Sequence, residues 1–210
     1  MNKKNHDGWD ILMNHKPYSL DFDGLTILIE DGVFTPDPSI SYSASMILDN
    51  LPDVADKTIA DVGTGTGVIG LVAASRGAQV VATDISEKAI ENATFNSREN
   101  GLEGKIDFVK TNLLDGVSEN FDYIFANIPI AESVWSKQGV DVDSTVKKFL
   151  TDVKEYLNKE GKIYLPWGSF AEQARIQVEK ILNEKGLTFK LLTKNILGFT
   201  WYLYIISIKD

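Results

Sequence analysis

One short stretch has the residue types and spacing needed to bind a ligand through its backbone. Thr58–Val62 is predicted to be a short buried strand that contains Asp61, and Gly63, Gly65 and Gly67 follow it at intervals of two residues. Glycine lets a strand-to-helix turn approach a ligand closely. A helix that begins near Gly67 would point its N–H groups and the positive end of its dipole at that ligand.

A second carboxylate follows at a fixed distance along the chain. Asp84 comes directly after the next predicted strand, residues 78–83, about twenty residues beyond the glycine turn, where a carboxylate can accept hydrogen bonds from a ribose diol. The combination indicates a site for a nucleoside-containing cofactor. Residues 65–70 also match the dinucleotide pattern G-x-G-x-x-G, so an NAD-binding Rossmann oxidoreductase is one alternative.

The elements that must position these residues alternate regularly between strand and helix. This alternation predicts an α/β fold, a seven-stranded, mostly parallel sheet with helices on both faces. Residues 193–200 are too few for a crossover helix, so the last strand is predicted to be antiparallel. Ser169 and Glu172 predict a capping box that opens the helix before Gly186. The predicted strands cover residues 58–62, 78–83, 106–109, 121–126, 162–166, 187–192 and 201–208.

A small hairpin is predicted before the main fold. Tyr18–Phe22 and Leu25–Ile29 alternate apolar and polar residues, and Asp23-Gly24 between them is a strong hairpin signal. We therefore expect an N-terminal extension over residues 1–32 and one main domain over residues 33–210. Pro36 and Pro38 stiffen the segment that joins the two and place it where it could cover a bound cofactor.

Composition limits the kinds of partner. The 210 residues include 21 basic and 30 acidic side chains, a formal net charge of −9, and no cysteine. A negative field disfavours contact with extended nucleic acid, and the missing cysteines rule out a thiolate metal site. The longest apolar runs are about seven residues, far below the roughly 20 of a membrane span. We expect a cytoplasmic protein with no metal site, and the oligomeric state stays open.

Three motifs resemble one family of enzymes. The loop of residues 61–67, Asp-Val-Gly-Thr-Gly-Thr-Gly, resembles the first motif, D/E-x-G-x-G-x-G, of Rossmann-like S-adenosylmethionine-dependent methyltransferases. Residues 32–36, Gly-Val-Phe-Thr-Pro, resemble the small-methyltransferase-domain group, which includes glutamine-amide methyltransferases of release factors and guanine-amino methyltransferases of ribosomal RNA. Residues 127–130, Asn-Ile-Pro-Ile, resemble the Asn-Pro-Pro-Tyr motif of amino-directed methyltransferases, with two of its four positions retained.

This resemblance implies S-adenosylmethionine as the cofactor and assigns its contacts. The loop backbone would hold the methionine portion, and Asp61 would organise its amino-acid end. Asp84 would bind the ribose, and the side-chain oxygen of Asn112 would accept a hydrogen bond from the adenine amino group. The candidate cofactor-binding residues are Asp61, Gly63, Thr64, Gly65, Thr66, Gly67, Asp84, Ile85, Asn112 and Leu113.

The resemblance also implies methyl transfer to a nitrogen acceptor at residues Asn127, Ile128 and Pro129. The Asn127 side-chain oxygen and the Ile128 carbonyl would accept the two hydrogens of an NH₂ group in a protein amide, a base or a small molecule. Because the family's aromatic residue is Ile130 here, either Phe34 or Trp135 replaces its stacking surface, or the acceptor is not a flat base or amide. Phe34 and Trp135 are the candidate substrate contacts. A catalytically weak binding subunit with this fold is a further alternative. The expected partners are a small-molecule or protein substrate.

Overall fold

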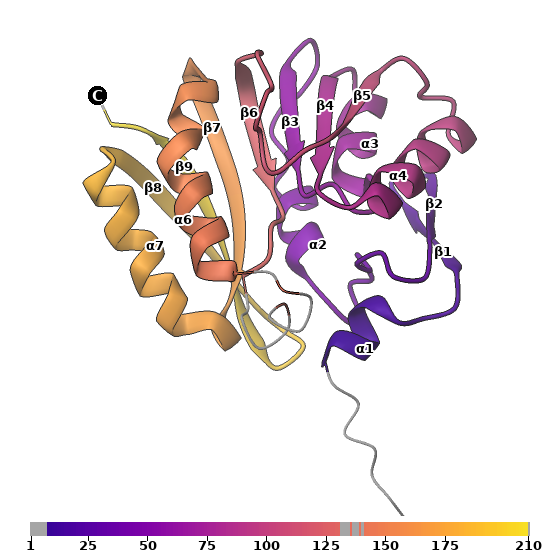
Figure 1. The fold of residues 1–210 in the computed structure, drawn as a ribbon, viewed down its shortest axis with the longest axis horizontal. Coiled ribbons are helices and arrows are strands. Elements are labelled where there is room, and N and C mark those ends of the chain that lie inside the picture. Colours follow the sequence, from indigo (N-terminus) through magenta and orange to yellow (C-terminus); the bar gives the residue numbers. More distant parts are fainter. Residues whose placement is uncertain (1–7, 131–134, 136–138, 140, 210) are drawn as a thin grey trace, which may run out of the picture.

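The computed structural model describes residues 8–130, 135, 139 and 141–209. Its elements form a two-stranded hairpin and a seven-stranded sheet with helices around them (Figure 1). The helices are α1 Gly8–Met13, α2 Ser43–Leu48, α3 Val68–Ser75, α4 Glu87–Glu99, α6 Val142–Asp152, η2 Val153–Tyr156, η3 Ser169–Ala171 and α7 Glu172–Glu184. The strands are β1 Tyr18–Phe22, β2 Leu25–Ile29, β3 Thr58–Val62, β4 Gln79–Asp84, β5 Ile106–Lys110, β6 Phe121–Ala126, β7 Leu157–Gly168, β8 Leu187–Ile196 and β9 Phe199–Ile208.

The large sheet has the strand order β5-β4-β3-β6-β7-β9-β8. Neighbouring strands from β5 to β7 are parallel, whereas β9 is antiparallel to both β7 and β8. The predicted mostly parallel sheet with an antiparallel last strand is confirmed. The chain runs outward from β3 through β4 to β5 and then returns to the other side of β3 as β6. Ligands of open α/β sheets bind at such a reversal, beyond the carboxyl ends of the strands.

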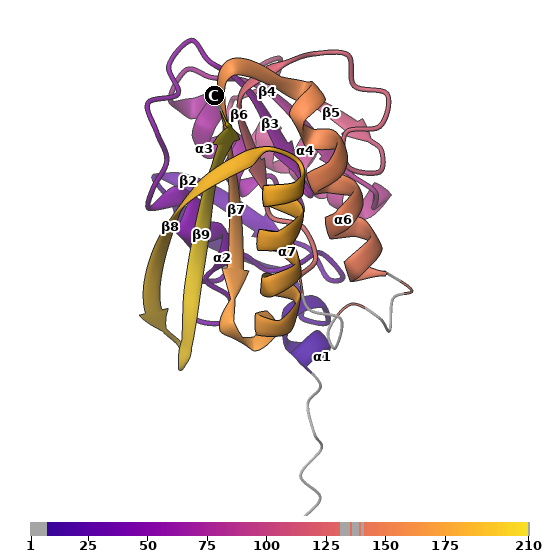
Figure 2. The ribbon, with the colours of Figure 1, turned by 90° about the vertical axis from the view of Figure 1, so that its left-hand side faces the viewer.

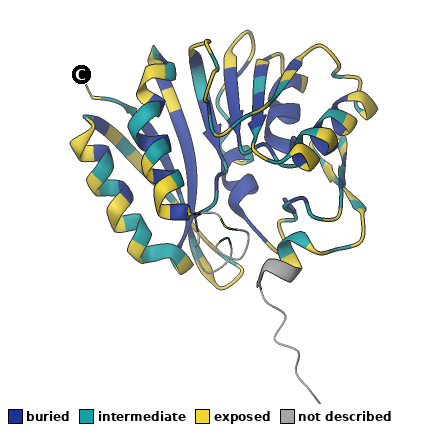
Figure 3. Ribbon diagram, in the orientation of Figure 1, coloured by how far each residue is buried: buried dark blue, intermediate teal, exposed yellow. Residues whose placement is uncertain are grey.

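Alternate residues of the strands feed two separate cores, one on each face of the sheet. Ile163 and Leu165 of β7 join the cluster that includes Phe149 of α6. Tyr164, which lies between them in the chain, joins the cluster that includes Ile47 of α2. Figure 2 shows α6 and α7 together on one side of the strands, and Figure 3 shows buried central strands beneath partly exposed helices. Helices on both faces are therefore confirmed.

Three asparagine side chains, two in α4 and one at its C-cap, fix the N-terminal hairpin to the domain. The Oδ1 atoms of Asn96 and Asn100 accept hydrogen bonds from backbone N–H groups of β2 at 2.9 and 3.0 Å, and that of Asn92 accepts one from the N–H of Glu30, directly after β2, at 3.1 Å. Four helical residues rise about 6 Å and two strand residues about 6.8 Å, so the two series stay nearly in step. Asn96 also donates to the carbonyl oxygens of Leu28 (2.8 Å) and Thr66 (2.9 Å). The hairpin is thereby tied directly to the glycine turn.

Two local predictions near the C-terminus are wrong. Ser169 does not cap α7; that helix begins at Glu172 with no side-chain cap, and the Ser169 Oγ accepts a hydrogen bond from the N–H of Thr200 (3.1 Å). The Ser169 hydroxyl therefore bonds to the backbone of β9 and is not available to cap α7. The strands β8 and β9 also extend further than predicted, and only Leu197 and Gly198 separate them, both with positive φ (56° and 76°), as tight hairpins require.

Candidate active site

The glycine turn is built around the buried carboxylate of Asp61. Its Oδ2 atom accepts hydrogen bonds from the Thr64 hydroxyl (2.7 Å) and from the N–H of Gly70 (2.9 Å). The side chain is 0% exposed, and this burial raises the pKa of Asp61 to about 6 against the opposing effect of those hydrogen bonds. A Cβ atom at position 70 would lie 3.0 Å from Oδ2, so only glycine lets α3 approach β3 this closely.

Asp84 holds the same turn from the end of β4. Its Oδ2 atom accepts a hydrogen bond from the N–H of Gly65 (3.0 Å), and its Oδ1 atom accepts one from the N–H of Ser86 (2.9 Å). Partial burial raises the pKa of Asp84 above its ordinary value, although these two backbone hydrogen bonds oppose the shift. Two carboxylates therefore shape one turn from neighbouring parallel strands.

The end of β6 lies directly against the glycine turn. The N–H of Asn127 donates to the carbonyl oxygen of Val62 (3.2 Å). A Cβ atom at Gly63, where φ is 72°, would lie 3.3 Å from the carbonyl oxygen of Asn127, so a larger residue there would force the two segments apart. Ile128 and Ile130 are buried, while Asn127 and Pro129 are half-buried. The polar side chain of Asn127 is thus placed beside the turn in apolar surroundings.

A cavity of about 780 Å³ lies over these segments. Its size falls within the roughly 300–1,000 Å³ of small-molecule sites. Of the predicted site residues, Asp61 and Gly67 do not line the cavity; they belong to the strand and turn that form its wall. The predicted residues that do line it are Phe34, Gly63, Thr64, Gly65, Thr66, Asp84, Ile85, Asn112, Leu113, Asn127, Ile128, Pro129 and Trp135.

The two predicted substrate contacts stack on each other in the cavity wall. The rings of Phe34 and Trp135 are nearly parallel, with centroids 5.8 Å apart and an interplanar angle of 24°. The Phe34 carbonyl oxygen also lies 4.0 Å from the position that a Cβ would take at Gly65. The stiff segment before α2 therefore runs beside the glycine turn, as its prolines suggested.

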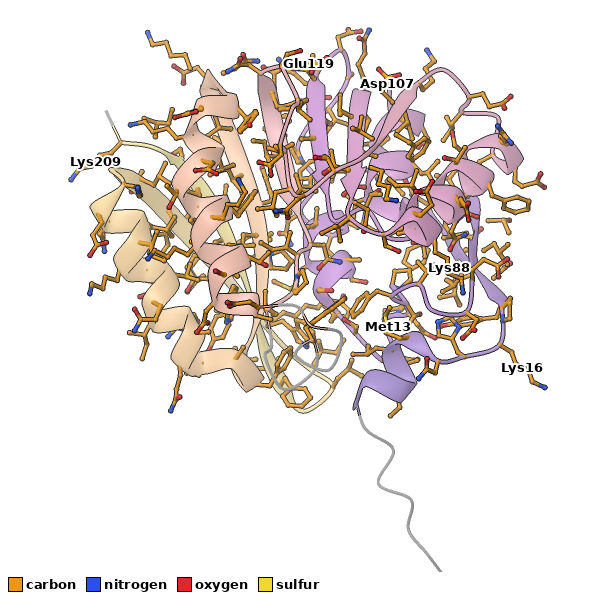
Figure 4. The ribbon with its side chains drawn as sticks, viewed as in Figure 1. Met13, Lys16, Lys88, Asp107, Glu119 and Lys209 are labelled. Carbon is orange, nitrogen blue, oxygen red and sulfur yellow. The ribbon has the colours of Figure 1, made fainter. Side chains whose placement is uncertain are left out.

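Sequence reasoning missed the far wall of the cavity. On one side α1 contributes Met13, which lies on the face of the helix toward the strands (Figure 4), and its carbonyl oxygen accepts a hydrogen bond from the N–H of Gly32 (2.7 Å). On the other side η3 and β9 contribute Phe170, Phe199 and Trp201. The only signal for the latter was their aromatic character beside a tight turn.

Membrane and metal sites find no support in the described part of the chain. None of the helices in residues 8–130 and 141–209 is long and apolar enough to cross a membrane. Among the same residues, no group of three or more His, Cys, Asp or Glu side chains is placed to hold a metal ion.

Residues 24–195 match the family model of the methyltransferase small domain. A protein of Methanocaldococcus jannaschii, provisionally named a protein N5-glutamine methyltransferase, is 26% identical over 184 residues, covering 82% of this chain and 88% of that protein. A ribosomal protein L11 methyltransferase of Dictyoglomus turgidum is 36% identical over 135 residues, covering 64% of this chain. The present chain spans only 39% of the length of that second protein.

A solved structure has the same fold. The 16S rRNA N2-guanine methyltransferase of T. thermophilus, solved in complex with AdoMet and guanosine, superposes with a TM-score of 0.69 and 19% identity, covering 93% of this chain and 50% of that one. At that identity the likeness concerns the fold alone. The family match and the reversed β9 together overturn the dinucleotide alternative, which required a parallel last strand.

Proposed function

This chain belongs to the methyltransferase small domain family, and from that premise we propose that its cavity binds S-adenosylmethionine and serves methyl transfer to a nitrogen acceptor held at Asn127. One observation carries the proposal. The tip of β6 and the glycine turn are joined by the hydrogen bond from Asn127 to Val62, so a group that holds the cofactor and a group that can orient an amine share one cavity wall.

The residues around the cavity fit S-adenosylmethionine in charge and hydrogen-bonding capacity. Within the described residues the Oδ1 atom of Asp61 has no hydrogen-bond partner, so its negative charge is left to attract the amino group of the methionine end across the turn. Asp84 would bind the ribose hydroxyls, because a carboxylate has about four acceptor positions and the backbone N–H groups of Gly65, Ser86 and Ile85 leave part of that capacity free. Asn112 would accept the adenine amino group, with Ile85 and Leu113 against the ring.

The chain's own groups can orient the acceptor. When bound, S-adenosylmethionine supplies a methyl group that its sulfonium already activates. The Asn127 side-chain oxygen and the Ile128 carbonyl would each accept a hydrogen bond from one N–H of an NH₂ group. These two bonds would turn the nitrogen lone pair toward the reacting methyl and stabilise the positive charge that develops on the nitrogen. The buried side chains of Ile128 and Ile130 exclude water and strengthen both hydrogen bonds. The nitrogen then releases one proton to solvent.

We also propose that residues 1–32 are an extension of a methyltransferase domain formed by residues 33–210. The asparagine contacts between α4 and β2 support this division, since the hairpin is attached through side chains and forms a separate sheet. For the acceptor, we propose a small molecule or a protein over extended nucleic acid. The formal net charge of −9 supports this preference, because it opposes contact with phosphate backbones.

Replacement of Asn127 tests the proposed reaction. Asn127→Ala is expected to lower turnover about 100-fold or more, because it removes one of two oriented acceptors, while the dissociation constant for S-adenosylmethionine stays within about twofold. Transfer is measured with methyl-labelled S-adenosylmethionine against blocked glutamine peptides, guanosine oligonucleotides and primary amines. Asn183→Ala, on the exposed face of α7, is the matched control and is expected to retain full activity.

The outcomes separate the proposed enzyme from its alternative. Equal loss of cofactor binding and turnover in Asn127→Ala would show that this residue serves the cofactor and not the acceptor. Cofactor binding without transfer to any acceptor would favour the catalytically weak binding subunit.

A further inference from the structure

Exposed apolar side chains gather around the cavity. Among the described residues, eight large hydrophobic side chains are exposed, and five of them line this cavity: Ile11, Ile40, Ile85, Phe170 and Phe199. Isolated exposed apolar residues are ordinary, but a contiguous exposed patch marks a binding surface. Ile85 is next to Asp84 and belongs to the proposed adenine contact, so the other four are left for a second ligand.

Two of these side chains belong to a second aromatic cluster, which lines the same cavity as the stack of Phe34 and Trp135. The ring of Phe170 meets the rings of Phe199 and Trp201 edge to face, with centroids 5.4 and 5.5 Å apart. Trp201 is 3% exposed, and its Nε1 atom has no hydrogen-bond partner within the described part of the chain. A buried indole N–H normally has a partner.

The position of this cluster explains how a ligand would be enclosed. The turn between β8 and β9 lies at the same end of the molecule as α1 in both views (Figures 1 and 2), and Phe199 is the first residue of β9 after that turn. Apolar and aromatic side chains from α1, the segment before α2, η3 and β9 line the same cavity as Asn127. The residues assigned to S-adenosylmethionine lie at the glycine-turn end of the same cavity.

The charges of the cavity restrict the ligand further. Among the described lining residues, the charged side chains are the carboxylates Asp84 and Asp141. Asp141 already uses its Oδ1 atom to cap α6 through the N–H of Ser144 (2.9 Å). Lys88 lies beside Gly32 but is not part of the lining. A phosphate or other anion bound here would find no lysine or arginine among the described lining residues. It would therefore lose its hydration without a compensating ion pair.

From these observations, and resting on the proposed function, we infer that the methyl acceptor is a small planar aromatic amine without phosphate that enters the cavity whole. Its ring would lie between the Phe34–Trp135 stack and the cluster of Phe170, Phe199 and Trp201. Offset or edge-to-face contacts of this kind add about 0.5–1.5 kcal/mol per pair beyond area burial. Its NH₂ group would reach Asn127.

Direct binding of a chosen probe tests this inference. The probe is 6-aminoquinoline, a planar bicyclic amine, titrated calorimetrically into the full chain with and without saturating S-adenosylhomocysteine. Guanosine 5′-monophosphate and a blocked glutamine peptide are the comparison ligands. We expect 6-aminoquinoline to bind at least about tenfold more tightly than either, because only it combines a planar aromatic ring for the aromatic walls with the lack of an anionic group, and no cation is found among the described lining residues.

Two phenylalanines of nearly equal exposure provide the matched variants. Phe199 (44% exposed) lines the cavity, whereas Phe95 (45% exposed) on α4 does not. Phe199→Ala is expected to weaken 6-aminoquinoline binding about tenfold, and Phe95→Ala to leave it within twofold. Phe199→Leu keeps apolar volume at the hairpin turn and is expected to weaken binding to a smaller extent, so a folding defect of the alanine variant would not obscure the result.

Contrary results have distinct meanings. Equal 6-aminoquinoline affinity in the wild type and both Phe199 variants would overturn the inference. Tighter binding of the nucleotide or the peptide would also overturn it and would point to a macromolecular acceptor. S-adenosylmethionine is titrated separately, and its failure to bind would refute the proposed function whatever the aromatic probe does.

Discussion

Asp61 gives the sharpest test of the site, because its burial opposes its charge. Burial raises its pKa from 3.8 to about 6. Because the folded protein then holds the proton more tightly than the unfolded chain, this group's contribution to stability is full below about pH 4 and is lost as the pH rises through about 6. One pKa unit corresponds to about 1.4 kcal/mol, so the wild type loses about 3 kcal/mol across this range.

Asp61→Asn removes this pH dependence while keeping the shape of the side chain. An amide oxygen can still accept the hydrogen bonds from Thr64 and Gly70, and the amide NH₂ would occupy the place of Oδ1, which has no partner within the described residues. The free energy of unfolding of the variant minus that of the wild type should therefore rise by about 2.4 kcal/mol from pH 4 to pH 7. Binding of S-adenosylmethionine should weaken in the same variant, since the negative charge is gone.

Urea unfolding at a series of pH values measures this difference, and any pH-independent effect of the substitution cancels from its slope. About half of the rise remains between pH 5 and pH 8, so the test still works if the wild type unfolds in acid. Asp107→Asn, an equal change of charge at an exposed position of β5 (Figure 4), controls for the net charge of the protein. A flat or falling difference curve for Asp61→Asn would refute the desolvation argument.

Two further substitutions test the parts that hold the glycine turn. Asp84→Ala should weaken S-adenosylmethionine binding by about tenfold or more through loss of charge-assisted hydrogen bonds, and an unchanged calorimetric dissociation constant would reject its ribose role. Asn96→Ala should lower the free energy of unfolding by about 2–3 kcal/mol, because it leaves the part-buried N–H of Leu28 and the buried carbonyl of Thr66 without their partner, while Asn92 still donates to the Leu28 carbonyl. Asn100→Ala, whose bonds to β2 are exposed, should cost under about 1 kcal/mol, since water replaces them; equal costs for the two asparagines would contradict this.

The sequence alone determined the parts of this protein that depend on short-range spacing. The interval between Asp61, the three glycines and Asp84 predicts a glycine turn between a strand and a helix, with a second carboxylate at the end of the next strand. The short connection before β9 likewise predicts its reversed direction. Asn127 could be placed next to the turn from its position after β6, even though only two of the four family residues are present there.

Tertiary structure alone decided which distant side chains complete the site. In the sequence, Asn96 is only a polar residue within a predicted helix. Its pairing with Leu28 of β2, 68 residues earlier in the chain, depends on how α4 docks against the hairpin. Ser169 has the local pattern of a helix cap, yet its hydroxyl accepts a hydrogen bond from the N–H of Thr200 in β9 instead. Phe170 and Phe199 meet for the same reason. Local periodicity encodes the helices and strands, whereas these contacts are set by the register and docking of elements far apart in the chain.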